Sequence, residues 1–393
     1  MNALFLQCGA PTAVINGSLA AALRRLRAAH PAAESWGAQF GIHGLVTGRW
    51  TKLSGLAERQ LELLEQQPGA ALGGGRYPLT DEGAATAVAR LRQYDIDCVF
   101  FLGGNGTMAA AAKLAEAAGG ALRVAGIPKT IDNDLVATHT APGYGSAART
   151  LALAVRSVGL DMRAMRHKEE IAVVETMGRH VGWLTAATAL ARALPDDPPH
   201  LILLPEAPVT EEALLAAVTA AHRRHGYCVI ATTEGALTAA GVYYAQQYGE
   251  LPVDAQGQPS FGWSPGVSSA LAGLFLQRLG LHTRRIRLDM AQRSAGINPS
   301  PADQTLARRL AITATDAALG GASGFMAAVE AGSDDIWPTL VPLAAVAGQT
   351  RHVPPEWIAA TGLDVMPALV DYVRPLADLP LTPIVDLSQA SDE

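Results

Sequence analysis

The chain has 393 residues, of which 49% are hydrophobic and 17% are charged. This apolar content excludes an intrinsically disordered chain, and the length predicts at least two domains. The formal net charge of −6 argues against a nucleic-acid-binding protein. The first residues lack the basic segment of a signal peptide, and no stretch stays apolar over the roughly 18 residues that a membrane span needs. We therefore expect a cytoplasmic protein that binds neither membrane nor nucleic acid.

The chain contains three cysteines, Cys8, Cys98 and Cys228, which lie far apart and form no Cys-x-x-Cys pair. This spacing speaks against a disulfide framework and against a structural zinc site. Reduced thiols fit the cytoplasmic expectation.

Strand-like and helix-like segments alternate along the chain, which predicts an α/β fold with largely parallel sheets. In chain order we expect strands at 4–6, 98–102, 122–127, 170–175, 200–204 and 227–232, and helices at 18–29, 108–118, 184–194, 211–225, 268–279 and 302–319. The predicted architecture is two Rossmann-like parallel-sheet domains with a cleft between them. One domain comprises residues 1–145 and the other 146–262, and each is completed by part of 263–393.

A glycine-rich loop, Gly103-Gly104-Asn105-Gly106-Thr107, lies between a predicted strand and a predicted helix. Glycines there permit close approach of the backbone, and the free N–H groups of a helix start favour phosphate. A tight turn without a ligand needs the same glycines, and diacylglycerol and NAD kinases carry a similar loop. The loop alone therefore leaves these alternatives open.

Two carboxylates, Asp132 and Asp134, follow the strand predicted at 122–127. Carboxylates placed so close together repel each other unless a metal, a proton or a cation intervenes, and Lys129 supplies one cation. In a phosphoryl-transfer centre one Asp accepts the proton of the attacking hydroxyl, the other helps to hold Mg²⁺, and Lys neutralises the phosphate. An Asx-rich turn with an exposed ion pair is the alternative for this segment by itself.

Taken together, the motifs of the chain resemble those of the phosphofructokinase family. The matching segments are residues 7–11, 74–77, 103–107, 126–134, 142–146, 175–180, 233–235 and 292–293, in an order that covers residue 4 to about residue 330. The runs Pro-Lys-Thr-Ile-Asp-Asn-Asp and Met-Gly-Arg-His-x-Gly-Trp are most similar to the bacterial pyrophosphate-dependent branch. Diacylglycerol and NAD kinases lack this set beyond the glycine loop.

The resemblance implies a Mg²⁺-dependent transfer of phosphate to the C1 hydroxyl of fructose 6-phosphate, by a homodimer or homotetramer. Its site would lie between a donor-binding domain, 1–145, and a sugar-binding domain, 146–262. By matched motif, the catalytic residues are Asp132 as general base, Lys129, Thr130 and Arg179. The donor-binding residues are Gly9, Arg76, Gly104, Asn105, Gly106 and Thr107. The substrate-binding residues are Asp134, Met177, Gly178, Glu234, Arg284 and Arg293, one of these arginines coming from a neighbouring subunit, and the Mg²⁺ ligands are Asn105 and Asp134.

The motifs leave the donor and the acceptor open. Gly106 stands where an Asp in pyrophosphate users repels a nucleotide's α-phosphate, so it favours ATP, whereas Asn105 and Lys129 favour pyrophosphate. Glu170 and Met290 replace basic or polar residues that meet the 6-phosphate in the family. A different sugar phosphate, or a sugar without phosphate, is therefore an alternative acceptor. A metabolite-binding relative without turnover is the alternative of another class.

Overall fold

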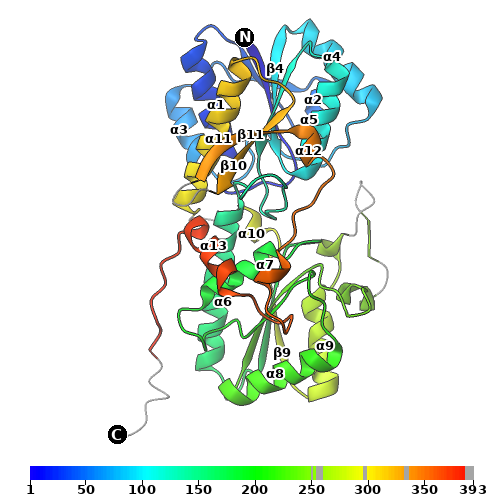
Figure 1. Ribbon diagram of the computed structural model, residues 1–393, viewed down its shortest axis with the longest axis vertical. Coiled ribbons are helices and arrows are strands. Elements are labelled where there is room, and N and C mark those ends of the chain that lie inside the picture. Colours follow the sequence, from blue (N-terminus) through cyan, green and yellow to red (C-terminus); the bar gives the residue numbers. More distant parts are fainter. Residues whose placement is uncertain (249–250, 254–259, 295–298, 332–335, 386–393) are drawn as a thin grey trace. The chain divides into compact units, whose positions relative to one another are not determined.

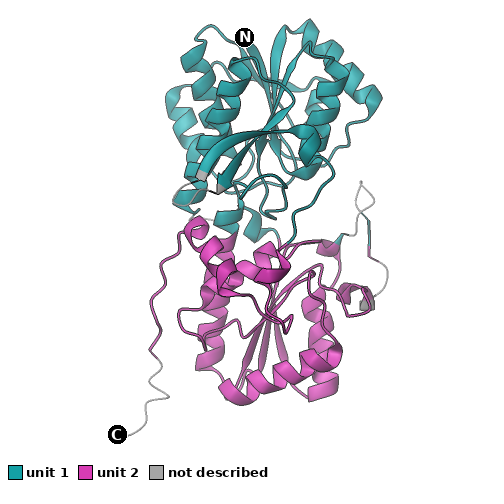
Figure 2. Cartoon of the chain, in the orientation of Figure 1, with its two compact units in different colours: residues 1–147, 252–260, 290–352 teal, residues 148–251, 261–289, 353–393 magenta. Residues whose placement is uncertain are grey.

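The computed structural model describes residues 1–248, 251–253, 260–294, 299–331 and 336–385. The chain forms two compact units, coloured separately in Figure 2: unit 1 comprises residues 1–147, 252–260 and 290–352, and unit 2 comprises residues 148–251, 261–289 and 353–393. The division between residues 147 and 148 falls inside the long helix α6 (Tyr144–Ala164). The functional roles assigned to the two domains stay predictions.

Unit 1 contains a seven-stranded sheet with the order β11-β10-β5-β4-β1-β2-β3 among the described residues. The strands are β1 (Asn2–Gln7), β2 (Ser35–Ala38), β3 (Trp50–Lys52), β4 (Ile96–Gly103), β5 (Arg123–Pro128), β10 (Phe325–Ala331) and β11 (Ile336–Pro342). The five central strands run parallel, and β3 and β11 are antiparallel edge strands. The helices are α1 (Ile15–Ala29), α2 (Ile42–Thr47), α3 (Glu58–Gln66), α4 (Asp81–Gln93), α5 (Asn105–Ala118), α10 (Ala291–Ser294), α11 (Pro301–Leu319) and α12 (Leu343–Val346).

Helices cover both faces of this sheet, as Figure 1 shows. Leu4 and Val99 belong to one core with residues of α4 and α5, whereas Phe5 and Phe100 belong to the other with residues of α1 and α11. The rings of Phe5 and Phe100 stack with their centroids 4.8 Å apart. Successive side chains of a strand point to opposite faces, so a sheet covered on both sides needs continuous apolar runs. These runs are the signal from which the sequence predicted β1, β4 and β5, whereas β2, β3, β10 and β11 were not predicted.

Unit 2 contains a parallel sheet with the order β7-β8-β6-β9. Its strands are β6 (Ile171–Thr176), β7 (Leu201–Leu203), β8 (Cys228–Thr233) and β9 (Thr283–Arg287). Its helical elements, besides most of α6, are α7 (Trp183–Ala187), η1 (Thr188–Ala191), α8 (Glu211–His225), η2 (Tyr244–Tyr248), η3 (Phe261–Trp263), α9 (Val267–Leu279), η4 (Pro355–Trp357) and α13 (Pro367–Ala377). Two units with parallel sheets confirm the predicted α/β class. Among the helices that the structure describes, none has the length and apolarity of a membrane span.

Two helices begin earlier than predicted. Helix α1 begins at Ile15 rather than at residue 18, and the Thr12 hydroxyl accepts a hydrogen bond from the Ile15 N–H (3.2 Å). Helix α5 begins at Asn105 rather than at residue 108, so part of the glycine-rich loop is the first helical turn. Helix propensity does not identify a helix start that consists of glycines and small polar residues, because these residues are also typical of turns.

The helix predicted at 184–194 is wrong beyond residue 191. Helix α7 ends at Ala187, a 3₁₀ turn follows to Ala191, and the backbone then becomes extended at Arg192 (φ −78°, ψ 117°). The Arg192 guanidinium donates to the Pro199 carbonyl (2.8 Å) and to Asp364 (2.9 Å). Pro199 lies seven residues along the chain from Arg192, whereas Asp364 lies 172 residues away and leaves no sign in the local sequence.

His200, directly before β7, extends the pairing with β8 through its side chain. Its backbone N–H donates to the Val229 carbonyl (2.8 Å), and its Nδ1 accepts from the Val229 N–H (3.0 Å). The ring stacks on His225 with the centroids 4.5 Å apart. Burial, and then the neighbouring His225, Arg192 and Arg163, lower the pKa of His200 to about 3, against the opposing effect of Asp196. The imidazole is therefore neutral in the folded chain.

We expect the free energy of unfolding to fall as the pH drops below about 6.5, the ordinary pKa of histidine. In that range the unfolded chain binds a proton at His200 that the folded chain binds only near pH 3. The loss from this one residue reaches about 2 kcal/mol at about pH 5. Urea unfolding at several pH values across this range measures the loss in the free energy of unfolding.

His200→Asn keeps a hydrogen-bond acceptor near the Nδ1 position but does not titrate, so it should flatten the pH dependence. The same change at the exposed His167 is the matched control and should keep the dependence of the wild type. An unchanged slope in His200→Asn contradicts the prediction.

Candidate active site

The carboxyl ends of β1, β4 and β5 lie side by side in unit 1. Gln7 pairs with Leu102 across β1 and β4, and Gly103 pairs with Pro128 across β4 and β5. The segments that follow, residues 8–11, 104–107 and 129–134, therefore start at one edge of the sheet. Open parallel sheets bind their ligands at this edge. The parallel register thus brings three separate sequence motifs together.

The glycine-rich loop forms the start of α5 at this edge. Gly104 is the N-cap residue, Asn105 is the first helical residue, and the Thr107 N–H donates back to the Gly104 carbonyl (2.9 Å). A β-carbon on Gly103 would lie 2.1 Å from the Thr107 hydroxyl, whereas one on Gly106 would have no atom within 4 Å. Gly103 is therefore required by packing, and Gly106 borders open space. Helix-start N–H groups provide donors for an anion.

Lys129 is buried, with 4% of its surface exposed, and ties these segments together. Its Nζ donates to the carbonyls of Cys8 (2.9 Å) and Ala10 (2.6 Å), and its backbone N–H donates to the Gly103 carbonyl (2.9 Å). Gly9 has a positive φ of 75°, and a β-carbon there would lie 3.4 Å from Nζ. The loop after β1 is thus folded around the ammonium group.

The electrostatic surroundings of Lys129 mark this edge as a site for an anion. Burial lowers the pKa of Lys129 to about 8, and the positive charges of Arg76 and Arg293 act in the same direction. Cys8, and then the negative charge of Asp132, act in the opposite direction and raise the pKa of Lys129. Three cationic side chains of unit 1 therefore act on one region. A bound anion would relieve both their repulsion and the cost of burial.

A tight turn presents the two carboxylates. The Thr130 hydroxyl accepts from the Asp132 N–H (3.1 Å) and donates to Asp134 Oδ1 (3.4 Å). Between them Asn133 has a positive φ of 55°, a conformation that Asn tolerates better than most residues. Asn133 Oδ1 accepts from the Thr140 hydroxyl and from the Ala141 N–H, each at 3.2 Å. The turn therefore fixes the relative positions of Asp132 and Asp134.

Asp134 and Asn105 form an oxygen-rich pair that fits a hard cation. Asn105 Nδ2 donates to Asp134 Oδ2 (2.8 Å), and Asn105 Oδ1 is buried without a hydrogen-bond partner among the described residues. Burial, and then the charge of Asp132, raises the pKa of Asp134 to about 7. Mg²⁺ is commonly held by one or two carboxylates together with phosphate oxygens and water. No cluster of three or more His, Cys, Asp or Glu ligands occurs in the described part of the chain.

Asp303, which the sequence analysis missed, supports this turn from α11. Its buried carboxylate accepts from the Gly143 N–H (2.9 Å), the Ser146 N–H (3.0 Å) and the Ser146 hydroxyl (2.6 Å). The adjoining Pro142 carbonyl accepts from the Thr130 N–H (3.0 Å). The sequence contains a local signal only for the helix start at Ser300, because the other partners of Asp303 lie 157 and 160 residues away.

In unit 2 the carboxyl ends of β6 and β8 bring together the predicted sugar-binding segments. Thr176 pairs with Thr233 at the strand ends, and the Glu234 N–H donates to the Thr176 carbonyl (2.9 Å). A β-carbon on Gly235 would lie only 2.0 Å from the Arg179 carbonyl oxygen. The segment 177–179 therefore lies directly against 234–235.

A buried carboxylate, Glu175, supports the segment at 177–179 and was also missed as a contributor. Its Oε2 accepts from the Ser268 N–H (2.8 Å) and hydroxyl (2.7 Å), at the start of α9. Arg287 Nε lies 3.2 Å from Oε1. The end of β6 is thus fixed to both α9 and β9.

Arg284 lies at the opposite end of the sheet in unit 2. It pairs in register with the beginning of β6, so about 17 Å of strand separates it from Met177. Its exposed guanidinium binds Glu169 (2.7 Å), and the neighbouring Glu170 accepts from the His282 N–H (2.7 Å). Within one chain, Arg284 therefore does not join Met177, Gly178 and Glu234.

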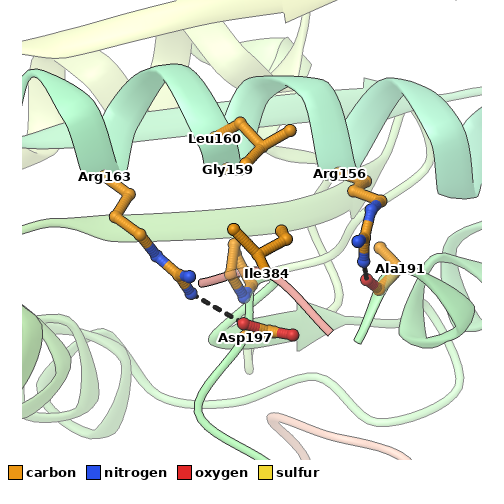
Figure 3. Close-up of a pocket in the computed structure, with 8 residues that line it drawn as sticks. Arg156, Gly159, Leu160, Arg163, Ala191, Asp197 and Ile384 are labelled. Atoms are coloured by element: carbon orange, nitrogen blue, oxygen red, sulfur yellow. Dashed lines mark hydrogen bonds and ion pairs between the residues drawn. The ribbon is translucent and has the colours of Figure 1, made fainter. Parts of the chain in front are cut away.

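A small pocket of unit 2 contains none of the predicted site residues (Figure 3). It is lined by Arg156, Gly159, Leu160, Arg163, Ala191, Asp197, Pro198 and Ile384. Arg163 is paired with Asp197 (2.6 Å) and Arg156 donates to the Ala191 carbonyl (3.5 Å). The polar groups shown there bind one another, so the pocket is a packing feature of α6.

The chain is similar to proteins of known activity over nearly its whole length. The family model Phosphofructokinase matches residues 2–318. A pyrophosphate–fructose 6-phosphate 1-phosphotransferase of Xanthomonas campestris pv. campestris (strain B100) is 35% identical over 387 residues, which cover 95% of this chain and 91% of that protein. A sulfofructose kinase of Alkalicoccus urumqiensis is 33% identical over 390 residues, covering 98% and 97%.

The fold has a matching solved structure. The pyrophosphate-dependent phosphofructokinase from Marinobacter aquaeolei superimposes with a TM-score of 0.86 at 29% identity. The match covers 98% of this chain and 94% of that one.

Gly74→Ala should destabilise unit 1 by about 1–3 kcal/mol, the usual cost of overpacking. A β-carbon at Gly74 would lie 2.3 Å from the Gly9 carbonyl oxygen, beside the hydrogen bond from the Gly9 N–H to Gly75 (2.9 Å). Gly55→Ala is the matched control, because a β-carbon there meets no atom within 4 Å. Urea unfolding of the two variants decides, and equal stabilities contradict the prediction.

Proposed function

The chain belongs to the phosphofructokinase family, and on that premise we propose that it transfers the terminal phosphoryl group of ATP to the C1 hydroxyl of fructose 6-phosphate. The observation that carries the proposal is the edge of unit 1 at which the helix start at Gly104, the buried Lys129 and the carboxylates of Asp132 and Asp134 meet. Phosphoryl transfer requires mainly positioning, neutralisation of charge and a base for the alcohol. This edge supplies all three.

In the proposed mechanism Asp132 accepts the proton of the C1 hydroxyl as its oxygen attacks the terminal phosphorus. The Thr130 hydroxyl, which binds the Asp132 N–H, orients the segment. Lys129 and Arg179 neutralise the charge of the transferring group. Mg²⁺, held by Asp134 and Asn105, would offset the charge of the phosphate chain when bound.

The remaining donor contacts follow from the edge of unit 1. Backbone groups of Gly9, Gly104 and Thr107 face the phosphate chain in this proposal, and Arg76 adds a positive charge that also acts on Lys129. Gly106 supports ATP over pyrophosphate, because its open surroundings leave room for a longer phosphate chain.

On the acceptor side, Met177, Gly178 and Glu234 contact the sugar in this proposal. Arg293 and Arg284 bind its 6-phosphate. Since Arg284 lies at the far end of β6 in its own chain, it would serve the site of a second copy. The proposed enzyme is therefore a homodimer or homotetramer.

Specific observations favour a second candidate for each substrate. Pyrophosphate is supported by the relative from Xanthomonas campestris, by Lys129 and by Asn105. A different acceptor is supported by Glu170, by the exposed Met290 and by the similarity to a sulfofructose kinase. Both alternatives use the same carboxylate and the same phosphate-binding edge.

Asp132→Ser should lower kcat by about 10²–10⁴-fold, because it removes the proposed base. A coupled assay with fructose 6-phosphate, Mg²⁺ and either donor measures the change. Asp371→Ser, which removes an exposed carboxylate of α13, is the control and should retain full activity. Undiminished turnover in Asp132→Ser would exclude this residue as the base.

Gly106→Asp should lower kcat/KM for ATP by about 10²-fold and affect pyrophosphate far less. The added carboxylate would occupy the open space beside the phosphate chain and repel a nucleotide's α-phosphate. Parallel assays with both donors and one acceptor measure the two values. If the wild type uses pyrophosphate better than ATP, the ATP proposal is wrong and the second candidate replaces it.

A further inference from the structure

Thr233, the last residue of β8, connects the two segments of unit 2 that the proposed function assigns to the sugar. Its side chain is fully buried. The hydroxyl donates to the Gly178 carbonyl and accepts from the Gly235 N–H (3.4 Å). One side-chain oxygen therefore bridges the segment after β6 and the segment after β8.

The pairing of the strands ends at this point. Thr176 and Thr233 are the last register pair of β6 and β8, and the Glu234 N–H makes one further hydrogen bond to the Thr176 carbonyl (2.9 Å). Beyond it no register pair of the ladder joins the two segments, so other contacts hold their spacing. The Thr233 hydroxyl supplies such a contact.

The packing around this hydroxyl is tight. A β-carbon on Gly178 would lie 2.9 Å from the Thr233 hydroxyl and 2.5 Å from the Val181 carbonyl oxygen, and Gly178 has a positive φ of 135°. On the other side Gly235 packs against the Arg179 carbonyl, 2.0 Å from where its β-carbon would be. The two segments are therefore in backbone contact, and the hydroxyl sets their spacing.

We propose that Thr233 is a positioning residue that fixes Glu234 relative to Met177 and Gly178 and so sets the affinity for the acceptor. It acts through the Gly178 carbonyl and the Gly235 N–H, since its own side chain is buried. The inference rests on the proposed function, which takes these segments as sugar-binding. Binding groups must be held to within about 0.5 Å to be productive, so losing this bridge weakens sugar binding.

The chain provides a matched control in the preceding residue. Thr232 is also fully buried in β8, but its side chain points to the other face of the sheet. Its hydroxyl has no hydrogen-bond partner among the described residues. A Thr→Val change at either position removes the same atom from the same strand, and only the change at Thr233 breaks the bridge.

Thr233→Val should raise KM for fructose 6-phosphate by about 10–100-fold, because displacements near 1 Å have effects of this size. KM for the phosphate donor should change far less than KM for the sugar, since the residues proposed to bind the donor lie in unit 1 and only Arg179 of the disturbed segment meets the transferring group. Thr233→Ser keeps the hydroxyl and should restore the wild-type KM. Thr232→Val should behave as wild type in both respects.

Hydrogen–deuterium exchange provides a second measurement that needs no substrate. Residues 177–180 and 234–236 should exchange faster in Thr233→Val than in Thr232→Val, while β6 and β8 themselves exchange equally in both. If Thr233→Val only destabilised unit 2 as a whole, exchange would instead be faster throughout its sheet.

The outcomes separate the inference from the proposed function. If wild-type protein phosphorylates fructose 6-phosphate and Thr233→Val shows the same acceptor KM as Thr232→Val, the inference is wrong and the proposed function stands. If wild-type protein phosphorylates this sugar with neither donor, the proposed function is wrong. In that case unchanged local exchange in Thr233→Val overturns the bridge, and faster local exchange supports it.

Discussion

The edge of unit 1 at the carboxyl ends of β1, β4 and β5 depends on the hydrogen bonds of one buried group, the ammonium of Lys129. Removing a cation from water is costly, and the lowering of the pKa of Lys129 to about 8 reflects that cost. The carbonyls of Cys8 and Ala10 and the charge of Asp132 compensate for part of it. A phosphate chain at the Gly104 helix start would supply the negative charge that is still missing. In the proposed function this positive charge is therefore most stable with the phosphate donor bound.

The carboxylates at the same edge lack a positive charge, whereas Lys129 lacks a negative one. With its pKa raised to about 7, Asp134 is readily protonated near neutral pH unless a cation is present, and the unpaired oxygen of Asn105 lies in the same pair. Mg²⁺ and a phosphate chain together satisfy both requirements, because each supplies the charge that one half of the edge lacks. Donor and metal should therefore bind most favourably as a complex.

The sequence predicted the parts of the fold that depend on local pattern. Apolar runs predicted β1, β4 and β5 but not the central strands β2 and β10, and parallel pairing then explains why Gly104 and Lys129 lie at one edge. Residues whose partners are distant in the chain were not predictable in this way: Asp303 binds a backbone group 160 residues away, and Thr233 binds one 55 residues away. Arg284 was assigned by motif, but its place at the far end of β6 depends on a strand register that its local sequence does not specify.

In the proposed function the two units recognise their ligands by different physical means, and this difference bears on specificity. Unit 1 uses charges, helix-start N–H groups and the open space at Gly106, and electrostatic attraction falls off slowly with distance. Such an edge tolerates donors of different length, in keeping with a family that contains both pyrophosphate and ATP users. Unit 2 would instead use backbone-to-backbone glycine contacts and the buried Thr233 hydroxyl, which impose shape at short range. Close-packed, fully hydrogen-bonded sites reject analogues most strongly, so we infer that discrimination between sugars is stricter than discrimination between donors.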